Sequence, residues 1–521
     1  MPLITGQDLI DAGYEPGEQF ATLLEAAAEY EGRGITDKKY ALKLLKKRFL
    51  PPPPKEKMRE KAAPFTEAIV GTNKEEKENV AKVRSKMAEL MKVPIIERGA
   101  VMPDACPAGA AKAVIPVGGA IAVQNAIIPS AHSADICCSM YASFYRERSD
   151  VKSELNALAT ATRFGPGGRH FDDLVHHPVL DEDVWHNRFL VDLHERARSQ
   201  IADQGDGNHF AYIGEVTLDV SQVNVLRKAG YGAIADDLTV SEEGNDTAPQ
   251  VRKYRVLVTH HGSRSLGAHV YKRGQVAALK HTAKVAAHIP KAAAWLDATS
   301  EMGAAYWEAL QYVARWTKAN HQAIHARFLQ RIGAEVVTEF GNEHNFVWKR
   351  GDMFMHGKGA TPAWSDEQGR PLLGLIPLNM AAPILMVLGK DNDEFLSFAP
   401  HGAGRNISRT AFKRQFPDAE SRQRSIEAST EGIDVRWFCG GADLSETPEA
   451  YKNAEQVKAQ IEQFGLAEVV AEIQPLGCIM AGDSGVSWRQ RKEEELTPKQ
   501  KRQIEHRSER RRTRQDLRDE W

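Results

Sequence analysis

The sequence has few cysteines and no long hydrophobic run. Its 521 residues include five cysteines at scattered positions, an odd number that does not suit a disulfide framework. No apolar stretch approaches the roughly 20 residues that span a bilayer, and the first residues lack the charged and then apolar pattern of a secretory signal. These absences predict a soluble protein of the reducing cytoplasm with no membrane partner.

The sequence also has little net charge, but that charge is unevenly distributed. The formal net charge of -2 argues against a uniformly basic nucleic-acid coat. Both flanks are nevertheless basic: residues 38–61 hold ten Lys or Arg against two acids, and residues 489–521 hold twelve against eight. Either flank could contact phosphates by charge alone, and a solvated surface explains both flanks equally well.

Length and patterning predict a mixed α/β fold with four segments. The chain is long enough for two to four domains or for one large core with additions, and 42% of its residues are hydrophobic. Helical patterns begin near Thr5, Phe20 and Thr36, whereas strand-like runs such as Ala113–Val117 and Ala120–Val123 occur later. The segments are a helical module (1–50), a proline hinge with a charged helical linker (51–95), a core (96–486) and a basic tail, helical or disordered (487–521).

The N-terminal module has a pattern of its own. Its residues Thr5-Gly-x-Asp8-Leu-Ile-x-x-Gly13-Tyr14-x-Pro16-Gly17 resemble the helical tail of CCA-adding tRNA nucleotidyltransferases, a part that helps to hold tRNA. The pattern covers a common helical shape, so an ordinary packing module is the other interpretation.

Five residues of the core segment form a candidate metal site. Asp135 and Cys138 lie three apart, His209 follows a glycine turn, His260 ends a buried strand, and His344 stands at the start of another strand. One carboxylate, one thiolate and three imidazoles would supply one or two divalent ions, since two-metal phosphoryl sites usually share a bridging ligand. The mixture suits Zn²⁺ by softness, and Mn²⁺ would need more oxygen ligands. Ordinary core packing is the alternative for the cysteine.

Two other histidine patterns have different interpretations. His401-Gly-Ala-Gly404-Arg405 combines an imidazole nucleophile, backbone that a phosphate can approach closely and a planar cation, as a covalent nucleotidyl site needs. A glycine-rich loop with a hydrogen-bonded histidine is its structural alternative. His321 and His325 are four apart on a predicted helix but have no carboxylate at the usual spacing, so we expect core or interface histidines.

Seven motifs occur in the order of the RtcB-type RNA ligase family. They are Asp135-x-x-Cys138, Gly207-Asn208-His209-Phe210, His260-x-Gly-Ser-Arg264-x-Leu-Gly267, His344-Asn345, His356-x-Lys358-Gly-Ala-Thr361, Ile376-Pro-x-x-Met380 and His401-Gly-Ala-Gly-Arg405. Residues 96–486 therefore resemble this family, which implies a single large α/β core with a deep metal-containing cleft. The resemblance also implies a ligase that joins 2′,3′-cyclic phosphate or 3′-phosphate RNA ends to 5′-hydroxyl ends, using GTP and two Mn²⁺ ions. tRNA splicing and RNA repair are both open, as is the need for an archease-like activator.

The resemblance assigns roles by matching position. His401 would attack the α-phosphorus of GTP, and the guanylyl group would then pass to the RNA 3′-phosphate. The implied metal ligands are Asp135, Cys138, His209, His260 and His344. The implied nucleotide-binding residues are Asn208, His209, Tyr212, His344, Asn345, Pro377, Leu378, Asn379, Met380, Ile384, His401, Gly402, Ala403, Gly404, Arg405 and Ala481.

Five positions depart from the family's base-binding pattern. The family has Glu at Tyr212, Lys at Ala481, Gly-Ser at Leu378-Asn379 and Ser at Ile384. A buried base edge without partners costs roughly 1–3 kcal/mol per lost hydrogen bond. We therefore expect relaxed or altered nucleotide choice with an intact nucleophile and metal set. A non-catalytic RNA-binding relative and a metal-dependent cyclic-phosphate phosphoesterase are the alternatives, and neither requires His401.

Overall fold

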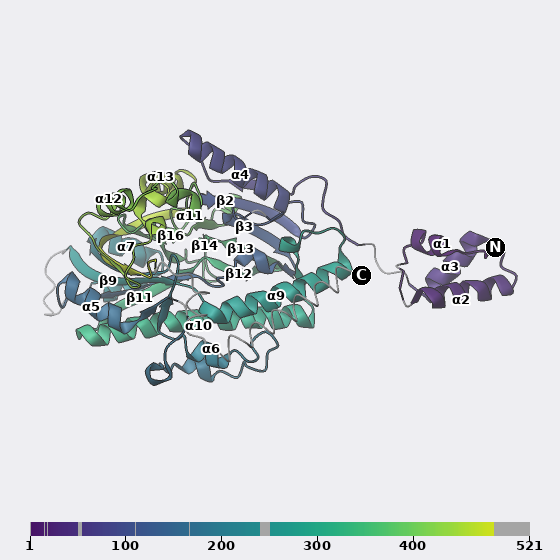
Figure 1. Ribbon diagram of the computed structural model, residues 1–521, viewed down its shortest axis with the longest axis horizontal. Coiled ribbons are helices and arrows are strands. Elements are labelled where there is room, and N and C mark those ends of the chain that lie inside the picture. The colour runs from purple at the N-terminus through teal and green to yellow at the C-terminus, as the bar shows by residue number, and fades with distance from the viewer. Residues whose placement is uncertain are drawn as a thin grey trace.

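The computed structural model of the chain describes residues 2–14, 16–17, 19–50, 55–109, 111–165, 167–239 and 251–483. The predicted hinge at Pro51–Pro54 and the predicted basic tail at 487–521 lie outside the described residues. Figure 1 shows two sheets with two long helices along one side, and three N-terminal helices set apart from them. Mixed α/β architecture was the prediction, and the structure confirms it.

The larger sheet has eight strands and is curled. In spatial order seven of them are β11 (Val336–Glu343), β5 (Ser139–Tyr145), β9 (Arg252–His261), β8 (Phe210–Leu218), β19 (Ala467–Met480), β16 (Ile384–Gly389) and β15 (Leu373–Pro377), and β18 (Asp434–Trp437) also pairs with β19. The two end strands contact each other, because the Asn342 carboxamide accepts from Leu375 N at 2.8 Å and donates to Leu375 O at 3.2 Å. This curvature encloses a hydrophobic cluster that includes Phe144, Tyr254 and Met386.

The smaller sheet has five strands. Their order is β1 (Phe65–Glu67), β2 (Ile96–Cys106), β3 (Val117–Gln124), β13 (Met353–Lys358) and β12 (Asn345–Arg350). Two-stranded pairs join β4 (Ala126–Ile127) to β10 (Leu296–Asp297), β6 (Arg163–Phe164) to β7 (Asp203–Gly205), and β14 (Ala360–Pro362) to β17 (Phe398–Pro400). Of the strand run expected at Ala113–Val117, only Val117 lies in a strand, since Ala113 has a positive φ of 50° and Pro116 has no N–H to donate.

Helices surround the two sheets. They are α4 (Lys74–Leu90), α5 (Val151–Ala161), α6 (His194–Arg198), α7 (Val220–Lys228), α8 (Gly232–Asp237), α9 (Arg264–Val285), α10 (Glu301–Ile332), α11 (Arg409–Lys413), α12 (Ala419–Ser429) and α13 (Ala454–Gln463). The longest, α10, starts at the Ser300 cap and ends at Gly333, whose φ of 64° closes the helix without a steric penalty. None of the described helices is both long enough and apolar enough to cross a membrane.

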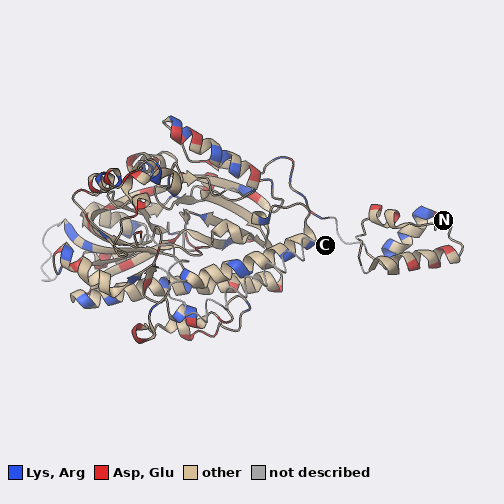
Figure 2. Ribbon diagram, viewed as in Figure 1, with Lys and Arg blue, Asp and Glu red and all other residues tan. Residues whose placement is uncertain are grey.

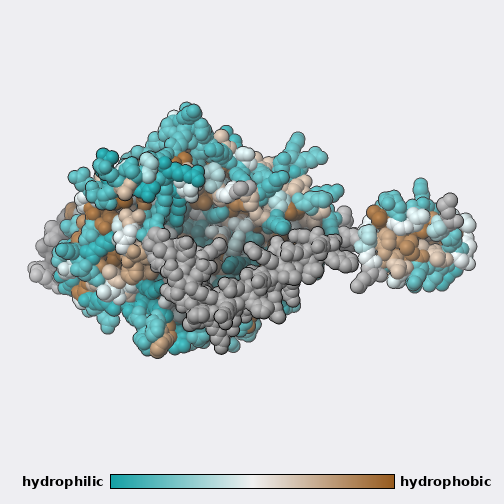
Figure 3. Space-filling model, in the orientation of Figure 1, coloured by the Kyte–Doolittle hydropathy of each residue, from teal (hydrophilic) through white to brown (hydrophobic). Residues whose placement is uncertain are grey.

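The N-terminal helices pack on each other. They are α1 (Gly6–Asp11), α2 (Gln19–Gly32) and α3 (Lys38–Arg48). Thr5 and Asp8 form a reciprocal cap on α1, whereas α3 is capped by Asp37 rather than by the expected Thr36. Their hydrophobic cluster, with Leu9 and Leu45 at its centre, contains none of the described residues beyond Phe49. Figure 3 shows a patch of apolar surface on these helices, while the face of the core in the same view is mostly hydrophilic.

Residues 55–95, expected to be a charged linker, pack against the smaller sheet. β1 pairs in parallel with β2, and α4 places Val83 and Met87 in a hydrophobic cluster with residues of β2 and β3. The charged side chains of α4 are mostly exposed on its other face, and Figure 2 shows them along the helix while the strands are largely uncharged. The segment therefore contributes to the core as well as connecting to it.

Candidate active site

Strand order explains how residues far apart in sequence meet at one edge of the larger sheet. Cys138 directly precedes β5 and His209 directly precedes β8, whereas His260 lies at the end of β9 and His344 follows β11. Because β11, β5, β9 and β8 are antiparallel neighbours, the ends of two strands lie beside the starts of the other two. The four candidate ligands therefore lie close together at one edge of the larger sheet.

The candidate metal ligands converge. Cys138 Sγ lies 3.2 Å from His260 Nε2 and 3.6 Å from His209 Nε2, while His260 Nε2 lies 3.2 Å from His344 Nε2. His209 Nε2 is 3.0 Å from Asp135 Oδ2. The ligand atoms form two groups of three, Cys138 with His260 and His344, and Cys138 with Asp135 and His209, each within 4.8 Å. Cys138 belongs to both groups, which is the position of a bridging ligand.

The protonation states of this cluster suit a cation. Burial lowers the pKa of His260 to about 3 and that of His344 well below its usual range, so both imidazoles are neutral. Burial would raise the pKa of Asp135, but the charge and hydrogen bond of His209 lower it to about 2, so the carboxyl is ionised. Burial raises the pKa of the Cys138 thiol well above its usual range. A bound cation would favour the thiolate, and the donor set therefore fits one or two divalent ions.

Asn208 fixes which nitrogen His260 presents to the cluster. The carbonyl oxygen of Asn208 can only accept, so His260 donates from Nδ1 to it at 3.2 Å and turns Nε2 toward Cys138. Thr259 Oγ1 lies 2.6 Å from His321 Nδ1 and 2.8 Å from His325 Nε2. Both of these histidines are buried and hydrogen-bonded in the core, as the sequence predicted.

His401 is oriented by a buried carboxylate. Its Nδ1 lies 2.5 Å from Asp104 Oδ2 at the end of β2, and the Asp104 side chain is fully buried. Because the carboxylate only accepts, the imidazole carries its proton on Nδ1, and Nε2 keeps a free lone pair. The His401 ring is 4.9 Å from the ring of His344, measured between centroids. The His401 imidazole and the candidate metal ligands thus share one site.

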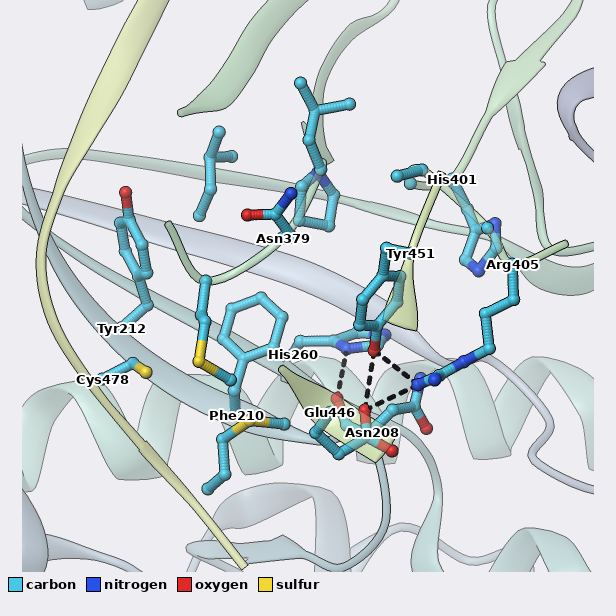
Figure 4. Close-up of a pocket in the computed structure, with 18 of the residues that line it drawn as sticks. Asn208, Phe210, Tyr212, His260, Asn379, His401, Arg405, Glu446, Tyr451 and Cys478 are labelled. Atoms are coloured by element: carbon cyan, nitrogen blue, oxygen red, sulfur yellow. Dashed lines mark hydrogen bonds and ion pairs between the residues drawn. The ribbon is translucent and has the colours of Figure 1, made fainter. Parts of the chain in front are cut away.

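A cavity of about 240 Å³ extends from His401 between the two sheets. Figure 4 shows His401, Arg405, Glu446 and Tyr451 on one side of it and Tyr212 and Cys478 on the other. The predicted nucleotide residues that line it are Asn208, Tyr212, Pro377, Leu378, Asn379, Met380, Ile384, His401, Gly402, Ala403, Gly404 and Arg405. Gly404 has a φ of 69°, and a Cβ there would overlap the backbone oxygen of Asp104, so glycine is needed where the loop packs against β2.

Four predicted nucleotide residues do not line this cavity. His209 and His344 lie in the metal cluster instead. Asn345 is used within the fold, since its Oδ1 accepts from Gly359 N at 2.7 Å. Ala481 is buried, and its carbonyl accepts from Cys439 N at 2.9 Å.

Arg405, expected as a cation for a phosphate, already has an acidic partner. Its Nη2 lies 3.0 Å from Glu446 Oε2 and 2.9 Å from the Tyr451 hydroxyl, and its guanidinium lies 4.2 Å above the Tyr451 ring. Arg409 also pairs with Glu446, at 2.9 Å. Figure 4 shows Arg405, Glu446 and Tyr451 near Asn208 at the His401 side of the cavity. An incoming anion would therefore meet two arginines held in place by one carboxylate.

Sequence reasoning missed Asp104, Glu446 and Tyr451. Asp104 was detectable as the only acid in the apolar run 99–106, where a buried strand would need a partner for it. Glu446 and Tyr451 stand in a segment without periodic pattern, and nothing in the sequence singles them out.

Comparisons with known proteins agree with the motif order. A family model described as RtcB, tRNA-splicing ligase RtcB, matches residues 182–481. The tRNA-splicing ligase RtcB of Archaeoglobus fulgidus is 27% identical over 313 residues, 54% of this chain and 60% of that protein. The same-named protein of Nanoarchaeum equitans is 25% identical over 312 residues, 55% of this chain and 60% of the relative. RNA-splicing ligase RtcB2 of Escherichia coli is 26% identical over 396 residues, 74% of this chain and 88% of that protein. The chain thus spans about 60% of the length of these archaeal relatives.

Proposed function

The chain belongs to the RtcB family, and on that premise we propose that it is an RNA ligase that works through a nucleotide bound covalently to His401. Its substrates are RNA ends that carry a 2′,3′-cyclic phosphate or 3′-phosphate and RNA ends that carry a 5′-hydroxyl. The names of the relatives favour tRNA splicing, with RNA repair as the alternative role.

The Asp104–His401 pair supports a nucleophilic role for the imidazole. Asp104 holds the proton on Nδ1 and stabilises the positive charge that develops when Nε2 forms a bond. Nε2 attacks the α-phosphorus of a nucleoside triphosphate, and the bond to pyrophosphate breaks. The Gly402–Gly404 loop lets the phosphates approach its backbone, and Arg405 and Arg409 lie at the same side of the cavity.

The next two steps transfer this activation to RNA. An oxygen of the RNA 3′-phosphate attacks the same phosphorus, the phosphorus–nitrogen bond breaks, and His401 is regenerated. The 5′-hydroxyl of the second RNA end then attacks the activated 3′-phosphate, loses its proton and displaces the nucleoside monophosphate. A 2′,3′-cyclic phosphate end first takes up water to become a 3′-phosphate.

Asp135, Cys138, His209, His260 and His344 would hold the divalent ions, proposed as two Mn²⁺. Such ions, when bound, supply Lewis-acid neutralisation of crowded phosphate oxygens. The chain's own contribution is to keep these ligands converged through the strand ends and to fix His260 by its bond to Asn208. Asp135, with 35% of its side chain exposed, opens this cluster to solvent and to substrate.

One observation carries the proposal: a histidine with a buried carboxylate on one nitrogen lies beside a convergent metal-ligand cluster at one end of a cavity of about 240 Å³. An RNA-binding relative without activity would not need the Asp104–His401 pair. A phosphoesterase that opens cyclic phosphates could use the metal cluster alone and would leave His401 without a role.

A labelling experiment tests the proposal. The full chain is incubated with Mn²⁺ and each α-³²P-labelled nucleoside triphosphate, and then assayed for ligation of RNA with 3′-phosphate and 5′-hydroxyl ends. We expect an acid-labile, alkali-stable protein adduct and joined RNA, both abolished in His401→Ala. Ligation that survives in His401→Ala would contradict the covalent mechanism.

A further inference from the structure

The cavity has an apolar side that lies opposite the arginines and Glu446. Strands β8 and β19 form its floor, because Phe210 pairs with Met480 and Tyr212 pairs with Cys478 across the two strands. The β15–β16 connection covers it. The apolar lining is Phe210, Tyr212, Leu378, Met380, Ile384, Cys478 and Met480. A triphosphate belongs at the charged side near His401, so the flat base of the same nucleotide belongs here.

The polar atoms on this apolar side are already used or neutral. The Tyr212 hydroxyl donates to Ile473 O at 3.0 Å, away from the cavity. Burial raises the pKa of the Cys478 thiol to about 12, so that group is uncharged. Among the described residues that line this side, none carries a carboxylate or a cationic group.

Of the described residues that line this side, Asn379 alone carries a side-chain amide. Its Oδ1 accepts from the backbone N–H groups of Ala381 and Ala382, both at 2.9 Å. These two bonds fix the carboxamide and leave the Nδ2 amino group for a ligand. The base would therefore meet a hydrogen-bond donor and apolar side chains.

Both purines have acceptors for this donor, guanine at O6 and N7 and adenine at its ring nitrogens, so the two bases differ here in how many donors they leave without a side-chain acceptor. Guanine presents N1–H and an N2 amino group, which need acceptors and would be buried without them. Adenine presents ring nitrogens that accept and a single amino group, so it leaves fewer donors unpaired. We propose, on the basis of the proposed function, that the cavity takes a nucleoside triphosphate with an adenine-like base in preference to guanine, with Asn379 as the specificity-determining residue.

Adduct formation with labelled ATP and GTP tests this inference. We expect ATP to label the chain at least about tenfold faster than GTP at equal subsaturating concentrations, because guanine buries one more unpaired donor group than adenine. In Asn379→Asp the carboxylate still accepts from Ala381 and Ala382 but replaces the donor with an acceptor, so the ATP-to-GTP rate ratio should fall by about tenfold or more. A preference of the unsubstituted chain for GTP overturns the inference, as does an unchanged ratio in Asn379→Asp.

Two further measurements keep the result interpretable. Asn156→Asp makes the same chemical change at an exposed position of α5, where Oδ1 accepts from Arg436, and should leave the ratio unchanged. Equilibrium binding measures the relative affinity for ATP and GTP in His401→Ala, which cannot form the adduct. The same measurement is made with Asn379→Asp added. If no nucleotide labels the chain but ATP still binds more tightly, the covalent mechanism fails and the inference stands. Equal or tighter GTP binding overturns the inference whether or not an adduct forms.

Discussion

Lys452 fixes the backbone on both sides of Asp104. Its Nζ donates to Pro103 O at 2.9 Å and to Ala105 O at 2.7 Å, and its side chain is buried. Asp104 in turn holds His401, which lies about 300 residues later in the chain but directly beside β2. The proposed nucleophile is therefore positioned by a carboxylate whose own backbone is held by the residue that precedes α13.

Asp104→Asn should slow adduct formation on His401 by about 10²- to 10⁴-fold. The amide cannot stabilise the positive imidazole and can present its amino group to Nδ1, which would turn the proton onto Nε2. Single-turnover labelling with a saturating nucleoside triphosphate measures the rate. Nucleotide binding should change little, because Asp104 does not line the cavity. Labelling at the unsubstituted rate in Asp104→Asn would show that the carboxylate has no positioning role.

The buried Lys452 side chain should make the free energy of unfolding depend on pH. Burial lowers its pKa from 10.5 to about 8, against the partial compensation of nearby Asp104. Between pH 8 and 10.5 the unfolded chain binds more protons than the folded chain, so the unfolding free energy contributed by Lys452 rises with pH. Below pH 8 both states carry the proton, and this slope disappears.

Urea unfolding of the unsubstituted chain and of Lys452→Met from pH 7 to 10 measures that term. The unfolding free energy of the unsubstituted chain minus that of Lys452→Met should be constant below pH 8. It should then increase by up to a few kcal/mol as the pH rises to 10. Subtraction removes the titration of other groups. A difference that stays flat to pH 10 would mean that the lysine is not charged and buried as described.

Sequence reasoning could reach the metal residues because each follows a simple local rule. His260 ends an apolar run, and His209 follows a glycine turn. These local patterns place both histidines at the ends of predicted strands. That these ends lie at the same edge depends on the antiparallel order of β11, β5, β9 and β8. Periodicity does not encode that order, and the motif resemblance implied the shared metal site without the strand order that forms it.

The missed residues act only through distant partners. The role of Asp104 depends on its contact with His401. The role of Glu446 depends on its ion pairs with Arg405 and Arg409. Arg405 looked like a free cation in sequence because its counter-charge is 41 residues away. The charged pattern of residues 74–90 likewise concealed that Val83 and Met87 form a buried face. The roles of these residues depend on contacts between distant parts of the chain, and local sequence preference does not reveal such contacts.

His344→Ala should lower divalent-metal binding by more than about 100-fold, since changes outside the ligand set already cost 10- to 100-fold in metal affinity. The residue supplies one of three converging atoms in its group, and alanine leaves Cys138 and His260 without it. Calorimetric titration of the protein with Mn²⁺ and with Zn²⁺ measures the affinity and the stoichiometry of metal binding. His176→Ala is the matched control, because His176 is an exposed histidine beside Asp181 on the surface. Equal loss in both variants would remove the cluster from consideration as a metal site.

Leu45→Ala should destabilise the N-terminal helices alone. Leu45 is fully buried among α1, α2 and α3, so the cavity left behind costs about 2–5 kcal/mol. Hydrogen exchange read by mass spectrometry should speed up over residues 3–49 and stay unchanged over the two sheets, since no core residue joins that cluster. Leu50→Ala, at an 88% exposed position, makes the same chemical change and should leave exchange unaltered. Faster exchange in β2 or β5 of Leu45→Ala would show that the helices and the sheets unfold as one cooperative unit.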